Sequence, residues 1–146
     1  MKTNGMKSFE SAEEVESVLR GFESCSTAPA EFGHREHLAV ALCYLVRSDT
    51  TAALERVRKG IYNFLTHYGE DPAGVYNETV TLFWLRRVRS FLDTHEHART
   101  LDGRANALLA ACGNSKVIYD YYSRERLSSD EARLAWVEPD LKPLDF

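Results

Sequence analysis

The chain has 146 residues, of which 44% are hydrophobic and 27% charged, and its formal net charge is −4. That composition is typical of a globular domain with a core, and the acidic balance argues against nucleic acid as a partner, because nucleic-acid binders carry a clustered basic excess. No apolar run approaches the roughly 20 residues of a membrane-spanning helix, and the first residues lack the apolar segment of a signal peptide. Cys25, Cys43 and Cys112 show no C-x-x-C spacing, so we expect free thiols in a cytoplasmic protein.

Helical periodicity runs through most of the chain, and no segment shows the alternation of a strand. Ser11 and Glu14 form a capping box that opens the first helix. We expect further helices at residues 31–47, 50–68, 76–93 and 104–112, a connection at 94–97, short helices at about 117–122 and 128–136, and an extended tail after Pro139. The prediction is a single all-α domain spanning 1–146, an antiparallel bundle of about four main helices with a loose terminus at 1–8.

Two histidines near the start of the second predicted helix point to its apolar face. His34 and His37 share a stripe with Leu38, Ala41 and Leu42, in the spacing of a buried helix face. Because buried polar groups need partners, either a hydrogen-bond network or a ligand has to meet these two rings.

The first turn of the helix predicted at 76–93 is also polar on its core side. Asn77 and Thr81 lie on its stripe, and Glu78 lies at the edge. If this helix runs parallel to the histidine helix, the two polar turns share one end of the bundle, where helix N-termini favour anions. We therefore predict one ligand-binding pocket formed by His34, His37, Tyr76, Asn77, Glu78 and Thr81.

Three interpretations of this pocket stay open. The histidines can be satisfied core residues, they can bind a small polar ligand, or they can form a weak divalent-metal site with Glu78 as the third ligand, because residues i and i+3 are neighbours on a helix. The second Glu-x-x-His motif that a di-iron bundle needs is missing. In an enzyme, His37 would be the general base and Glu78 would orient it.

Four stretches carry motifs that are specific only in combination. They read F-G-H-R-E-H-L at 32–38, A-L-E-R-V-R at 53–58, Y-N-E-T-V-T at 76–81, and Y-Y-S-R-E-R-L at 121–127 followed by W-V-E-P-D-L at 136–141. Together they resemble a family of small bacterial all-helical proteins to which no activity is assigned, so the resemblance implies no function. Such sequences often carry a histidine where this chain has Asn77, which is a poor ligand for transition metals.

These observations favour a soluble protein whose buried polar pocket binds a small polar molecule, with neither nucleic acid nor a membrane as partner. The alternative is an interaction or homodimerisation module whose histidines are purely structural. Its support is a set of aromatic residues in the C-terminal third, which would mark a partner surface if they are exposed: Tyr119, Tyr121, Tyr122, Trp136 and Phe146.

Overall fold

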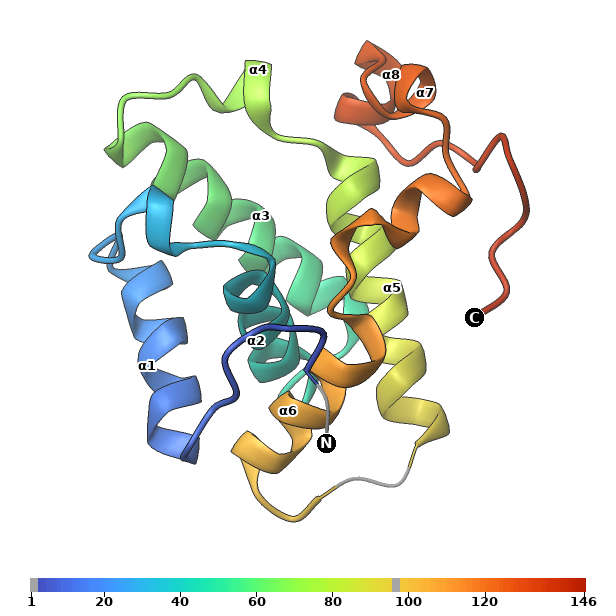
Figure 1. Cartoon of the computed structure of the whole chain (residues 1–146). Coiled ribbons are helices and arrows are strands. Elements are labelled where there is room, and N and C mark those ends of the chain that lie inside the picture. Colours follow the sequence, from blue (N-terminus) through green and yellow to red (C-terminus); the bar gives the residue numbers. More distant parts are fainter. Residues whose placement is uncertain (1–2, 96–97) are drawn as a thin grey trace.

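The computed structural model describes residues 3–95 and 98–146, and all regular elements in these two ranges are helices (Figure 1). In chain order they are α1 (Ala12–Glu23), the 3₁₀ turn η1 (Pro29–Glu31), α2 (His34–Leu45), α3 (Thr50–His67), α4 (Pro72–Val75), α5 (Glu78–Thr94), α6 (Leu101–Cys112), η2 (Ser115–Asp120), α7 (Arg124–Leu127) and α8 (Asp130–Leu134). This confirms the predicted all-α bundle. None of the helices described is long and apolar enough to cross a membrane.

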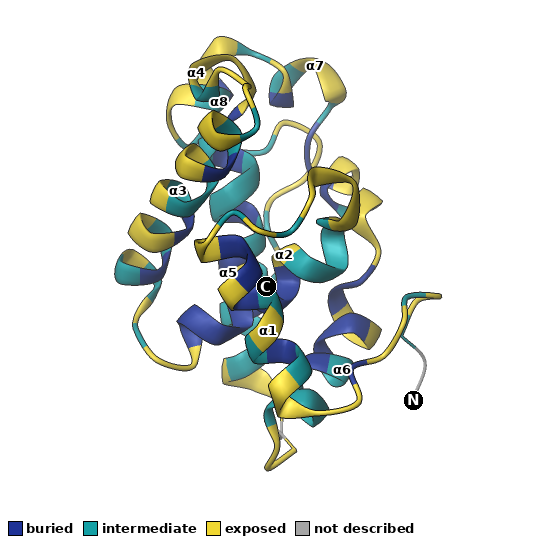
Figure 2. Ribbon diagram, turned by 90° about the vertical axis from the view of Figure 1, so that its left-hand side faces the viewer, coloured by how far each residue is buried: buried dark blue, intermediate teal, exposed yellow. Residues whose placement is uncertain are grey.

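The central helix of the bundle is α2, which packs against α1, α3, α5 and α6. Every residue from Leu38 to Leu45 is buried, whereas the first turn, with both histidines, is less enclosed (Figure 2). At its start, His34 contacts Trp84 of α5, and at its end the Leu45 carbonyl accepts a hydrogen bond from Arg89, farther along α5. The two helices therefore run in the same direction, as the sequence analysis supposes.

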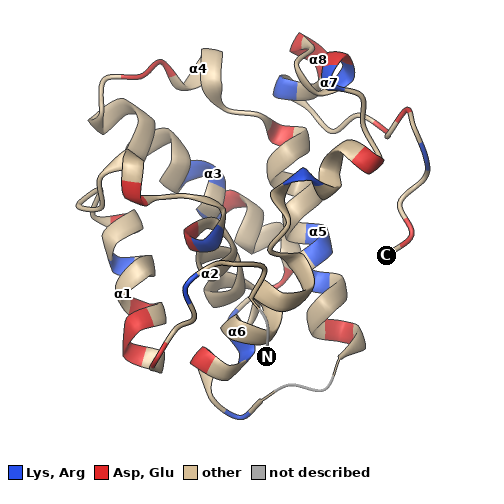
Figure 3. Ribbon diagram, in the orientation of Figure 1, with Lys and Arg blue, Asp and Glu red and all other residues tan. Residues whose placement is uncertain are grey.

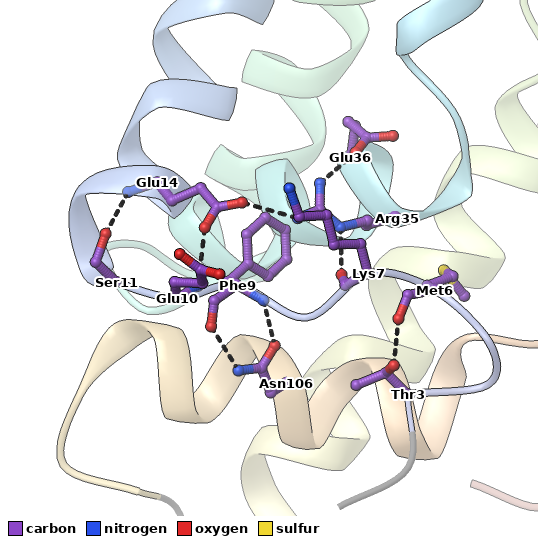
Figure 4. A network of polar contacts seen from close by, with 10 residues as sticks. All are labelled: Thr3, Met6, Lys7, Phe9, Glu10, Ser11, Glu14, Arg35, Glu36 and Asn106. Atoms are coloured by element: carbon purple, nitrogen blue, oxygen red, sulfur yellow. Dashed lines mark hydrogen bonds and ion pairs between the residues drawn. The ribbon is translucent and has the colours of Figure 1, made fainter.

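The segment before α1 is held against the bundle, so the predicted loose terminus is wrong for residues 3–8. Figure 4 shows Phe9 joined to Asn106 of α6 by two backbone-to-side-chain hydrogen bonds of 2.7 and 2.9 Å. The Arg35 guanidinium lies 3.8 Å from the centre of the Phe9 ring and pairs with Glu14 at 3.2 Å. These contacts fasten α1, α2 and α6 together. Residues 1–2 lie outside the described part of the chain.

The C-terminal third forms a second apolar cluster on α5. The Phe83 ring lies 5.5 Å from the ring of Tyr121 and 5.4 Å from that of Phe146. Tyr122 is completely buried, and its hydroxyl donates to the Val137 carbonyl. Of the five aromatic residues expected on a partner surface, Tyr121 and Tyr122 are buried, Trp136 and Phe146 are half-buried, and Tyr119 alone is exposed.

The basic positions in the middle of α5 (Figure 3) cover this cluster from outside. The Arg86 guanidinium lies 4.1 Å from the Trp136 ring centre, and that of Arg87 lies 5.3 Å from the Phe146 ring centre. Four of the five aromatic residues therefore pack within the chain, and Tyr119 is the one of the five with the exposure that the interaction-module alternative requires.

Several boundaries differ from the sequence prediction. The second long helix begins at His34 rather than residue 31, because Pro29–Glu31 form a separate 3₁₀ turn. The helix predicted from residue 76 begins at Glu78, where Asn77 is the N-cap, and the short helix α4 lies in the segment before it.

The later elements also differ from their prediction. Helix α6 begins at Leu101, three residues before the predicted start, because Thr100 supplies the cap. The aromatic segment is the 3₁₀ helix η2. The helix predicted at about 128–136 is the shorter α8, and α7 precedes it where no helix was predicted. The connection predicted at 94–97 includes residues 96–97, which lie outside the described part.

Candidate functional site

A cavity of about 260 Å³ lies between the first half of α2, α3 and the first half of α5. Nine of its twelve lining residues are apolar, and three are polar. The apolar ones are Phe22, Leu38, Val40, Ala41, Val57, Ile61, Val80, Trp84 and Leu85; the polar ones are His34, His37 and Thr81. The two histidines predicted to share a helix face thus border the same cavity.

His37 is an exposed residue whose ring borders the cavity, although many protein atoms surround it. Phe32 packs edge-on against the ring at 4.7 Å between centroids. No residue in the described part of the chain forms a hydrogen bond with either ring nitrogen. Burial, reinforced by the neighbouring His34, lowers the pKa of His37 to about 4, with Glu36 opposing the shift. The ring is therefore neutral near pH 7.

His34 has a defined partner on the neighbouring helix. Its Nε2 lies 2.9 Å from the Cys112 carbonyl at the end of α6, and its ring packs at 4.5 Å from Trp84. Burial lowers the pKa of His34, although the bond to Cys112 works against this shift. Because a carbonyl oxygen only accepts, the proton of the neutral imidazole is on Nε2 and the lone pair is on Nδ1.

Thr81 connects the cavity to a polar cluster on its outer side. In that cluster, Thr81 opposes the rise in the pKa of Tyr76 that burial and Glu78 cause, and the Tyr76 O–H donates to Glu78 at 2.6 Å. Both Glu78 oxygens also accept from Arg58, at 3.1 and 2.5 Å. Burial alone would raise the pKa of Glu78, but the bonds from Arg58 and Tyr76 outweigh burial and lower it, so this carboxylate is ionised.

The Asn77 side chain forms hydrogen bonds with backbone groups and does not line the cavity. Its side-chain oxygen accepts from the Val80 N–H and caps α5, and its amide nitrogen donates to the Leu127 carbonyl at 2.7 Å. An asparagine at the start of a helix satisfies backbone N–H groups that the helix itself leaves free. Both polar ends of this side chain are therefore occupied by structural contacts.

The structure thus divides the six predicted site residues into two groups. His34, His37 and Thr81 line the cavity, whereas Tyr76, Asn77 and Glu78 do not. It does not bring Glu78 to His37, because both carboxylate oxygens are engaged by Arg58 and Tyr76. Within the described residues, no group of three or more His, Cys, Asp or Glu side chains is placed to hold a metal ion.

Sequence reasoning missed two residues that define the site. Arg58 lies 20 positions before Glu78, and no local spacing relates them. Phe22 lines the cavity from α1, and its ring stacks on Phe32 at 5.3 Å. Trp84 of α5 also borders the cavity, which its helical spacing does not reveal.

Comparison with protein-family models, with curated proteins and with solved structures finds no match to this chain. The resemblance drawn from its motifs therefore stays a prediction, and the site has to be interpreted from its own geometry.

Proposed function

We propose that this protein binds a small, mostly apolar molecule with one polar group in the cavity between α2, α3 and α5. The observation that carries this proposal is the cavity itself, which nine apolar side chains line together with His34, His37 and Thr81. A mostly apolar cavity on which a few polar groups converge is the usual form of a small-molecule site.

The lining specifies how polar this ligand is. The sequence prediction of a polar ligand rested on six polar side chains, but three of these contact other protein groups instead. Nine apolar lining residues favour a ligand whose polar part is confined to one end, near His34, His37 and Thr81. An apolar cavity of about 150 Å³ is enough to hold benzene in another protein, so 260 Å³ can hold a substituted ring or a short aliphatic chain.

The cavity can be tested with Trp84 as a reporter. In a Trp136→Phe background, Trp84 is the remaining tryptophan, and its fluorescence should change when 4-methylphenol is titrated in. Ala41→Leu adds volume at a buried lining position and should abolish the change. Ala110→Leu, the same substitution at an exposed position of α6, is the matched control and should leave it intact.

The proposal fails if Ala41→Leu remains folded and binds as well as the control. It also fails if small aromatic and aliphatic alcohols, amines and acids all leave the Trp84 signal unchanged up to their solubility limits.

We also propose a cytoplasmic location. Cys25, Cys43 and Cys112 are all free thiols, two of them buried, which fits a reducing compartment. Measuring thiol content after purification without reductant tests this proposal, because an extracellular protein would tend to arrive with oxidised cysteines.

A further inference from the structure

The lining of the cavity is graded from buried to exposed. Six of its nine apolar residues are buried, with exposed fractions of at most 8%: Phe22, Leu38, Val40, Ala41, Val57 and Leu85. The three polar residues are more accessible, since His37 is exposed and His34 and Thr81 are half-buried. The polar part of the lining therefore lies nearer to solvent than most of the apolar part.

The directions of the helices give the same order. The three polar residues belong to the first turns of α2 and α5, which run in the same direction. The buried Ala41 and Leu85 lie one turn farther along these two helices. Helix α3 follows α2 after a short connection and packs against it, so it runs back the other way. Its half-buried Ile61 accordingly lies nearer to the polar end than its buried Val57.

Nothing in the lining favours a polar group at the buried end. None of the twelve described lining residues is a Lys, Arg, Asp or Glu. The carboxylates beside the polar end are paired with arginines, Glu78 with Arg58 at 2.5 Å and Glu36 with Arg35 at 2.7 Å. A polar group among the buried side chains would lose its water without a replacement, whereas at the polar end it stays hydrated.

We infer that the cavity recognises the apolar end of an amphiphilic molecule, which enters first and packs against the buried lining. The polar head stays at the open end beside His37, where a larger polar group is tolerated. This rests on the proposed function and deepens it, because it assigns selectivity to the apolar end of the ligand and not to its head group.

One pair of probes tests the buried end of the cavity on the unmodified protein. They are 4-ethylphenol and 4-hydroxybenzyl alcohol, which have similar shapes but differ in the polarity of the substituent opposite the phenol. In either orientation, 4-hydroxybenzyl alcohol has to place a hydroxyl among buried apolar side chains. Titration calorimetry should therefore show it binding about tenfold or more weakly than 4-ethylphenol.

A second pair tests the open end. They are 4-methylanisole and 4-methylphenyl glucoside, which share a methyl group and an ether oxygen but differ greatly in the size of the head. The sugar remains in water beyond the exposed His37, so the two should bind within about threefold of each other.

Variants locate the two ends. Val57→Thr preserves shape but adds a hydroxyl to the buried lining, so it should reduce the preference for 4-ethylphenol severalfold. Val75→Thr, at a side chain 51% exposed in α4, is the matched control and should retain the preference. His37→Trp adds bulk at the open end and should weaken binding of the glucoside severalfold more than that of 4-methylanisole, whereas His67→Trp, at an exposed histidine of α3, should not.

The outcomes separate this inference from the proposal on which it rests. Equal binding of 4-hydroxybenzyl alcohol and 4-ethylphenol overturns the apolar-end selectivity, and a glucoside that fails to bind where 4-methylanisole binds overturns the open end. Both results leave the cavity as a binding site. Binding of none of the four probes overturns the proposed function as well. An unchanged preference in folded Val57→Thr, or equal weakening of both ethers in His37→Trp, overturns the assignment of that end.

Discussion

At the scale of single residues, His37 links the stability of the fold to pH. Its pKa is about 4 in the folded chain, against an ordinary value of about 6.5, so between these values the unfolded chain binds a proton that the folded chain does not. Stability is therefore fully present above about pH 6.5 and is lost as the pH falls toward about 4. Thermal unfolding at about pH 7.5 and pH 5 should give a smaller drop in Tm for His37→Leu than for the unmodified chain.

Two features set the limits of this pH effect. Because the ring borders the cavity, its charge is partly screened, and the effect is smaller than for a fully enclosed histidine. His34, whose pKa is also lowered by burial, leaves some acid sensitivity in the variant. His67→Leu, which changes the last residue of α3 and leaves His37 in place, should keep the full drop. If His37→Leu were as acid-sensitive as the unmodified chain, the ring would be charged without cost, contrary to its lowered pKa.

At the scale of elements, the close approach of α1 and α3 depends on Gly60. A Cβ at this position would lie 2.3 Å from the Phe22 ring, which is itself stacked between Phe32 and Phe64. Glycine-to-alanine changes inside helices normally stabilise by up to about 1 kcal/mol, but overpacking here should outweigh that gain and destabilise by about 1–3 kcal/mol. Urea unfolding of Gly60→Ala measures the difference.

Gly74 of α4 supplies the control for Gly60, because a Cβ there meets nothing within 4 Å and its φ is not positive. Gly74→Ala should be neutral or slightly stabilising. A stable Gly60→Ala variant that still binds 4-methylphenol would mean that the Phe22 ring can move without cost, contrary to its role as a fixed wall of the cavity.

The attachment of α8 to α5 depends on one buried hydroxyl. Thr79 is completely buried, donates to the Ala135 carbonyl at 2.9 Å and accepts from the Val137 N–H at 3.2 Å. Thr79→Val keeps the volume but leaves both backbone groups unpaired, so we expect a loss of about 1–3 kcal/mol in the free energy of unfolding. Thr66→Val should change it by less than about 0.5 kcal/mol, and an equal effect of the two variants would contradict the assigned role.

The elements differ in how far their sequence determines them. The apolar stripe after His34 predicted that both histidines share one side of α2, and both do border the cavity, because that relation depends only on helical periodicity. The predicted burial does not hold for His37, which is exposed. Asn77 was predicted to face the pocket, but at a helix start its side chain caps the backbone instead. The pairing of Glu78 with Arg58 joins two helices, so it depends on the tertiary packing of α3 on α5, which local spacing does not encode.

The cavity itself could not be predicted from the sequence, because it too depends on tertiary packing. Its volume is the space left when α2, α3 and α5 pack around Gly60 and Phe22, so it depends on how well the side chains of three helices fill that space. The same composition with slightly different packing would give a filled core, in which the histidines would need protein partners.

At the scale of the whole molecule, the two apolar clusters meet on α5. Trp84 packs against both of them, and its neighbour Phe83 lies at the centre of the C-terminal cluster. This shared helix predicts that the chain unfolds as one cooperative domain. Urea unfolding monitored by Trp84 in Trp136→Phe, and by Trp136 in Trp84→Phe, should give transitions as sharp as those that far-ultraviolet circular dichroism records for the same two variants.

Phe146→Ala gives this prediction its decisive test. It removes a ring that packs 5.4 Å from Phe83 in the second cluster, far from the first cluster along the chain. In one cooperative unit, the change lowers the urea midpoints reported by Trp84 and by Trp136 together. The free energy of unfolding should fall by about 1–3 kcal/mol, as expected for loss of a half-buried ring. Leu141→Ala, at a side chain 56% exposed, should shift neither. A shift confined to the Trp136 signal would mean that the C-terminal cluster unfolds by itself and that the predicted single domain consists of two units.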